Sequence, residues 1–180
     1  RMMLPSDAVS AFRLTELMAN TEGMCYMRTL RPDVPFLYGF DEQFQMGGFK
    51  HLIDGEDVAI VASGYMVHVA KAAVKILEER AGLSATLIDA YSIPLATDEI
   101  LQIGDDCEGR ILVVEDNYIG GIADEITAAA AASDLGVFVQ TMYVRNMPKS
   151  SKTPQESLAM VNLTAEDIAA TCQKMFDATE

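Results

Sequence analysis

The sequence contains few of the residues that build metal or redox centres. Its 180 residues include two histidines and three cysteines, and the cysteines lie far apart, at positions 25, 107 and 172. Zinc sites need closely spaced His or Cys ligands, and disulfide-stapled folds need an even set of cysteines, so neither class fits. Scattered free thiols are typical of a reducing compartment, which predicts a cytoplasmic protein with no metal ligands of its own.

Basic residues and long apolar runs are also scarce. There are 13 Lys and Arg against 27 Asp and Glu, a net charge of −14. Residues 1–35 are balanced, with four of each sign, so the whole acidic excess falls in residues 36–180. Such a surface repels nucleic acid and anionic membranes, and no apolar run reaches the roughly 20 residues that span a bilayer. We therefore expect neither a nucleic-acid nor a membrane partner.

Glycine and proline divide the chain into three parts. Residues 1–35 contain one predicted helix, capped by Ser6 or Asp7 and ending near Ala19, and one predicted strand over 24–29. Residues 36–56 read as a linker, with room for a short strand over 49–53. One helix and one strand cannot bury their apolar faces alone, so residues 1–35 are expected to be the end of a domain or to pack on the later part of the chain.

The third part, residues 57–180, alternates strands with helices. This order predicts an α/β fold in which a three-layer, parallel-rich mixed sheet has helices on both faces. The predicted strands are 58–62, 85–89, 110–115 and 137–144, and the predicted helices are 67–80, 98–103, 122–132, 154–160 and 165–178, with Thr97 and Thr164 as caps.

Two arginines at the exit of the first predicted strand are the leading candidates for a binding site. Arg31 precedes Pro32, which keeps it in extended or turn backbone, and Arg28 lies three residues earlier. An arginine fork at the carboxyl end of a strand suits a phosphate or carboxylate. The alternative is a surface salt bridge or a loop anchor.

Other polar motifs are better explained by structure than by chemistry. The turn at Gly64 lacks both the dinucleotide-binding and the Walker patterns, so it indicates a tight strand-to-helix turn. Glu115 and Asp116 form a carboxylate pair, but without a nearby nucleophile or histidine they favour helix capping over acid–base catalysis. His68 is expected to be a packed or surface residue. The segment 145–149 could bind an anion, but a loop contact is favoured.

Several of these segments together resemble transketolase. The entry Pro5-Ser-Asp-Ala8, the exit Arg28-Thr-Leu-Arg31-Pro32, the linker Asp41-Glu-Gln-Phe-Gln-Met-Gly47 and the turn Glu115-Asp-Asn-Tyr-Ile-Gly-Gly121 follow the family's order. The resemblance spans nearly all of the chain. One departure is Leu30, where the family usually has serine.

The resemblance implies an enzyme that transfers a two-carbon ketol unit between ketose and aldose phosphates in the pentose phosphate pathway. It implies thiamine diphosphate with Mg or Ca as cofactors, and a homodimer. The family's metal motif and its activating glutamate are not in this sequence. The resemblance therefore implies a C-terminal section: the end of the pyrimidine-binding domain (1–35), a linker (36–56) and the C-terminal domain (57–180). Such a section, without its N-terminal part or subunit, is expected to bind no cofactor and to be inactive alone.

Matched to the family pattern, Arg31 is expected to bind the terminal phosphate of the substrate. Arg28 matches as well and is the second phosphate-binding candidate, although a supporting role in the loop fits it better. Two alternatives stay open. One is another thiamine enzyme, such as 1-deoxyxylulose-5-phosphate synthase or a 2-oxoacid dehydrogenase β subunit. The other is a non-catalytic regulatory α/β module. Pro-Ser-Asp-Ala with Arg-Thr-x-Arg-Pro favours transketolase over the other thiamine enzymes, and the unpaired first helix and strand argue against a free-standing module.

Overall fold

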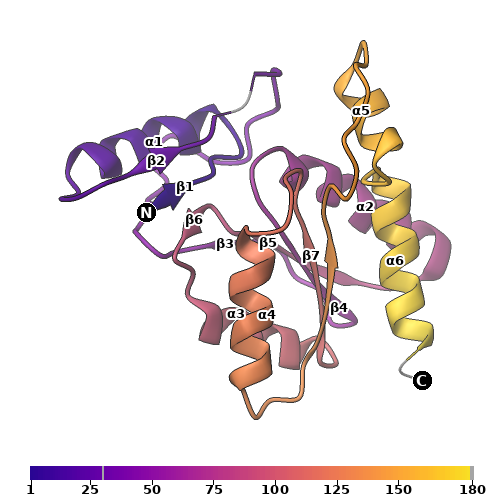
Figure 1. The fold of residues 1–180 in the computed structure, drawn as a ribbon. Helices are drawn as coiled ribbons and strands as arrows, with labels where there is room; N and C mark the ends of the chain where they lie inside the picture. Colours follow the sequence, from indigo (N-terminus) through magenta and orange to yellow (C-terminus); the bar gives the residue numbers. More distant parts are fainter. Residues whose placement is uncertain (30, 179–180) are drawn as a thin grey trace.

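A five-stranded sheet forms the centre of the molecule (Figure 1). The structure, a computed structural model, describes residues 1–29 and 31–178. The strands stand in the order β3-β5-β4-β7-β8, and all neighbours are parallel except β3, which runs antiparallel to β5 at one edge. This confirms the predicted mixed, parallel-rich sheet. The strands are β3 (Lys50–Ile53), β4 (Val58–Ala62), β5 (Ala85–Asp89), β7 (Arg110–Val114) and β8 (Phe138–Met142).

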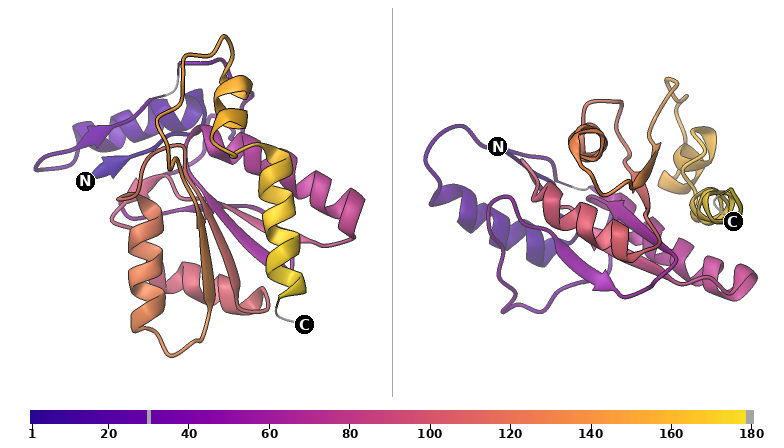
Figure 2. Two further views of the ribbon diagram at one scale, coloured as in Figure 1. Left: turned by 45° about the vertical axis from the view of Figure 1, so that its right-hand side comes forward. Right: turned by 90° about the horizontal axis from the view of Figure 1, so that it is seen from below.

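Helices cover both faces of the sheet, as the alternating pattern predicts. Alternate side chains of β4 explain the two cores: Ile60 packs in the cluster that contains α2 and α6, and Val61 in the cluster that contains α3 and α4. Figure 2 shows the sheet between these two pairs of helices. The helices are α2 (Tyr65–Ala81), α3 (Thr97–Asp106), α4 (Ile122–Ala132), α5 (Pro154–Met160) and α6 (Ala165–Asp177).

The first residues of the chain form a smaller sheet with a piece of the larger unit. Helix α1 (Ala8–Ala19) lies between β1 (Met2–Met3) and β2 (Tyr26–Met27) in sequence. Strand β1 pairs with β2 on one side and with β6 (Ser92–Ile93) on the other. Since β6 begins three residues after the end of β5, a strand of the main sheet, this pairing attaches the N-terminal segment to the main sheet.

Local details confirm some predictions and correct others. Asp7 caps α1 through a capping box, Gly82 ends α2 in the left-handed conformation, and Thr164 caps α6. The strand predicted over 24–29 is only two residues long, and Thr97 is the first residue of α3 rather than its cap. The domain boundaries at 35 and 56 stay a prediction.

A buried polar cluster joins the N-terminal segment to the carboxyl end of β5. The Asp89 side chain is fully buried and accepts hydrogen bonds from the hydroxyls of Ser6 and Tyr38, the latter at 2.6 Å. Its other oxygen, Oδ1, is buried without a hydrogen-bond partner among the described residues. Burial, with a smaller contribution from the charge of Asp7, raises the pKa of the Asp89 carboxyl to about 7. The two hydrogen bonds oppose this shift.

Each helix in the described part of the chain is too short or too polar to cross a bilayer.

Candidate functional site

One cavity lies where the connections of the sheet change direction. The chain leaves β4 toward β5 on one side and leaves β7 toward β8 on the other, so β4 and β7 are neighbours whose connections diverge. In α/β sheets such a switch point is the usual place for a ligand. Tyr65 follows β4, Asp116 follows β7, and both line a cavity of about 330 Å³.

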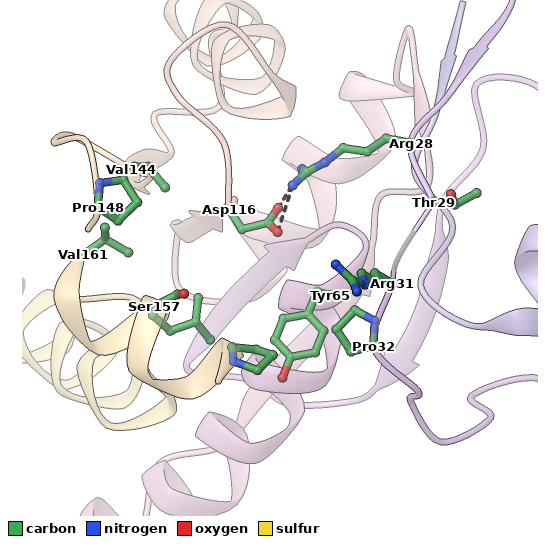
Figure 3. A pocket seen from close by; sticks show the side chains of 12 residues that line it. Arg28, Thr29, Arg31, Pro32, Tyr65, Asp116, Val144, Pro148, Ser157 and Val161 are labelled. Atoms are coloured by element: carbon green, nitrogen blue, oxygen red, sulfur yellow. Dashed lines mark hydrogen bonds and ion pairs between the residues drawn. The ribbon is translucent and has the colours of Figure 1, made fainter. Parts of the chain in front are cut away.

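Loops from both ends of the chain complete this cavity. The segment after β2 contributes Arg28 and Arg31, and the segment around α5 contributes Pro148 and Ser157. Figure 3 shows these side chains around the cavity, with Arg31 beside Tyr65. The cavity therefore depends on contact between segments more than 100 residues apart in sequence.

The side chain of Arg28 is already engaged. Its two terminal nitrogens lie 2.7 and 3.0 Å from the two carboxylate oxygens of Asp116, a bidentate ion pair (Figure 3). The side chains are partly buried, with exposed fractions of 38% for Arg28 and 24% for Asp116. This geometry fits the anchoring alternative for Arg28, because a second bidentate partner would have to displace Asp116. Phosphate binding by Arg28 stays a prediction that this pair makes less favourable.

Arg31 is placed differently. It is exposed, and among the described residues it makes no hydrogen bond or ion pair. It lines the switch-point cavity and also a second cavity of about 480 Å³ beside the start of α1. Leu30, the departure from the family pattern, lies outside the described residues. A free guanidinium between two cavities is suited to an incoming anion.

The second cavity contains a carboxylate that already has partners. Asp7 lines it, but its Oδ1 accepts from the backbone N–H of Ser10 at 2.7 Å. Its Oδ2 accepts from the backbone N–H groups of Leu37 and Tyr38, at 2.7 and 3.2 Å. Asp7 thus fixes the start of α1 and the linker together, and the sequence predicts only the first of these contacts.

Glu115 caps a helix, as the sequence predicts. Its two carboxylate oxygens accept the backbone N–H groups of Ile122 and Ala123 at the start of α4, both at 3.0 Å. Burial raises the pKa of the Glu115 carboxyl, while these hydrogen bonds lower it. The neighbouring carboxylate, Asp116, points to Arg28 instead, so the two acids do not work as one pair.

His68 has a structural contact, and the described residues form no metal centre. The Nε2 atom of His68 lies 2.7 Å from the backbone oxygen of Ser6, which again ties α2 to the N-terminal segment. Among residues 1–29 and 31–178, no three His, Cys, Asp or Glu side chains are grouped to hold a metal ion.

Sequence reasoning missed two features of the cavity lining, namely Tyr65 and the pairing of Asp116 with Arg28. Arg28 and Asp116 are separated by 88 residues. The available signal was that both follow a strand, since opposite charges at strand exits can meet at one edge of a sheet. Tyr65 offered a weaker signal, its position directly after the Gly64 turn.

Known proteins match this chain over most of its length. Residues 47–168 match the family described as transketolase, C-terminal domain. Human transketolase is 34% identical over 168 residues, which is 92% of this chain and 27% of that protein. Mouse transketolase is 36% identical over 167 residues, 91% of this chain and 26% of that protein. The chain thus spans about a quarter of the length of these relatives.

Solved structures agree. A split-gene transketolase, described as an inactive β4 tetramer, superposes with a TM-score of 0.90 at 29% identity, over 98% of this chain and 57% of that one. A transketolase from Pichia stipitis in complex with sedoheptulose-7-phosphate gives a TM-score of 0.74 at 21% identity, over 98% of this chain and 25% of that one, which shows the shared fold. Because the family model covers more than half of the chain, this protein belongs to the transketolase family and carries its C-terminal domain.

Proposed function

We propose that this chain is the C-terminal section of a transketolase, in which Arg31 binds the phosphate group of the sugar substrate. The complete enzyme moves a two-carbon ketol unit from a ketose phosphate to an aldose phosphate. The observation that carries the proposal is the contrast between the two arginines. Arg28 is held by Asp116, whereas Arg31 is exposed beside two cavities without a partner among the described residues.

The charge around Arg31 supports this role. The net charge of the whole chain is −14, so a phosphate is repelled by most of its surface. Near Arg31 the charge of Asp116 is balanced by Arg28, which leaves one uncompensated positive charge in this group of three. In the switch-point cavity an anion therefore meets Arg31 as the unpaired charge, whereas the second cavity beside Arg31 also contains the carboxylates of Asp7 and Asp33.

The cofactor would be held by other parts of the enzyme. Thiamine diphosphate with a divalent ion supplies the carbanion chemistry of the family when it is bound. The described residues do not fit such a metal, because no group of three ligands is present among them. We therefore propose that this section acts with an N-terminal part or subunit, in a homodimeric assembly, and is inactive alone. A split-gene relative, described as an inactive β4 tetramer, supports the part of this proposal that the section is inactive alone.

Substitution of Arg31 tests the proposal in the complete enzyme. A charge-assisted bidentate contact contributes roughly 1.5–3 kcal/mol, which is about a 10- to 150-fold change in binding. Arg31→Ala should raise KM for phosphorylated sugars by about that factor. It should change KM for an unphosphorylated donor such as hydroxypyruvate much less. Arg31→Lys should recover only part of the loss, because an ammonium cannot reproduce the fork.

The matched control is Arg145→Ala. Arg145 is another exposed arginine of this section; it lies over the Tyr143 ring and lines neither of the two cavities beside Arg31. Its substitution should leave both KM values unchanged. Equal losses with phosphorylated and unphosphorylated donors in Arg31→Ala would show that Arg31 is structural, and the proposed phosphate contact would be lost.

A further inference from the structure

The loop that carries Asp116 is fixed on both sides of this residue. Before it, the backbone N–H of Glu115 donates to the oxygen of Met142 at 3.0 Å, and the Glu115 carboxylate is held at the start of α4. After it, the oxygen of Asn117 accepts the N–H of Val144 at 2.9 Å. Asp116 is therefore presented from a rigid strand exit, although it lies in a loop.

Arg28 is the opposite case, because it lies at the end of a two-residue strand. Its backbone N–H donates to the oxygen of Met3 at 3.0 Å, at the end of the small sheet. Only two residues separate Arg28 from Arg31, and of these Thr29 is exposed, as is Arg31 itself. The side-chain contact with Asp116 is thus the anchor on the main sheet that lies nearest to Arg31 in sequence among the described contacts.

We propose that Asp116 is a positioning residue, which acts through Arg28 to set where Arg31 meets the substrate phosphate. This rests on the proposed role of Arg31. The bidentate geometry fixes both the distance and the orientation of the Arg28 fork relative to the switch point. Arg31, three residues later, takes its place from that fixed point. Asp116 also cancels the charge of Arg28, so that Arg31 is the anion-binding group left in this group of three.

Repulsion of the phosphate by the charge of Asp116 and positioning of Arg31 by Asp116 predict opposite changes in KM. A substitution of Asp116 therefore decides between them. If Asp116 only repels the phosphate, Asp116→Asn removes a negative charge and should lower KM for phosphorylated sugars. If Asp116 positions Arg28 and, through it, Arg31, the same substitution should raise this KM. For a half-exposed ion pair we expect a rise of about fivefold, equivalent to about 1 kcal/mol.

The experiment compares Asp116→Asn, Arg28→Gln and the double variant in the complete enzyme with its cofactors. Each single variant should raise KM for a ketose phosphate, with kcat and KM for hydroxypyruvate within about twofold of the parent. The double variant should raise KM no more than either single variant, because each single variant already removes the same contact between Arg28 and Asp116. Glu42→Gln is the control: Glu42 forms another half-buried ion pair, with Lys50, and lines neither cavity beside Arg31.

The outcomes separate this proposal from the one on which it rests. If Arg31→Ala gives a phosphate-specific loss but Asp116→Asn does not raise KM, Asp116 has no positioning role and the phosphate contact stands. If Arg31→Ala gives no phosphate-specific loss, the role of Arg31 fails first. Additive losses in the double variant would also overturn the positioning role. Should Asp116→Asn fail to assemble, the double variant reports on the same contact without leaving an unpaired carboxylate beside Arg31.

Discussion

The buried carboxyl of Asp89 makes the stability of this protein depend on pH in an unusual direction. Its pKa is raised by burial to about 7, from an ordinary value of 3.8. Below pH 3.8 the group is protonated in both the folded and the unfolded chain. Between pH 3.8 and 7 the unfolded chain loses this proton while the folded chain keeps it. The contribution of Asp89 to stability is therefore complete below about pH 4 and is lost as the pH rises to about 7.

The size of the effect follows from this difference. A difference of about three pKa units corresponds to a free energy on the order of 4 kcal/mol at about 1.36 kcal/mol per unit. Because the pKa of Asp89 in the folded chain is about 7, the range from about pH 5 to pH 8 covers about two of these units. The free energy of unfolding should therefore fall by roughly 2–3 kcal/mol over this range. Asn is a neutral substitute for the protonated acid and can still accept from Ser6 and Tyr38.

Urea unfolding at about pH 5 and pH 8 measures this loss. The unfolding free energy of Asp89→Asn relative to the parent chain should rise by about 2–3 kcal/mol across this range. Asp134→Asn, which removes an exposed carboxylate, should show no such change. A difference between Asp89→Asn and the parent that is the same at both pH values, or one that moves in favour of the parent as the pH rises, would refute the reasoning.

Two further predictions concern the loop after β7 and the thiols. A Cβ at position 121 would clash with Oε1 of Glu115, so Gly121→Ala should displace the helix cap and destabilise the chain by about 2–4 kcal/mol. Gly82→Ala, in open space at a φ of +67°, should cost only about 1 kcal/mol by the same unfolding measurement. Burial raises the pKa of the Cys172 thiol to about 12, so in the native chain a disulfide reagent should label the partly exposed Cys25 first; rapid labelling of Cys172 would contradict its burial.

The main sheet could be predicted from the sequence because its strands are buried on both faces. Residues 58–62 and 85–89 are nearly continuous apolar runs, and the structure places strands at the same residues. The antiparallel edge strand β3 could also be predicted, as a short strand over 49–53. Strands β1 and β6 were missed, because each has two residues and forms only when distant segments meet.

Features of the site could be predicted where their signal lies within a few residues of sequence. They could not be predicted where they depend on contacts between residues that are distant in sequence. The proline after Arg31 and the glycines before α4 are signals within a few residues of the feature they describe. The partner of Arg28 lies 88 residues away, so spacing alone could not decide which arginine is engaged. The same holds for Asp89, which ends a strand and whose partners Ser6 and Tyr38 come from distant parts of the chain.

Two of the contacts that attach the N-terminal segment to the main sheet are of opposite electrostatic kind. The Asp89 cluster is fully buried and is most stable when its carboxyl is neutral, so salt should affect it little. The Arg28–Asp116 pair is partly exposed and depends on both charges, so it should weaken as ionic strength rises. A moderate rise in salt should therefore weaken the contact between Arg28 and Asp116, while the start of α1 stays attached to β5 through the Asp89 cluster. If Arg31 binds the substrate phosphate as proposed, that affinity should depend on salt through the position of Arg31 as well as through direct screening.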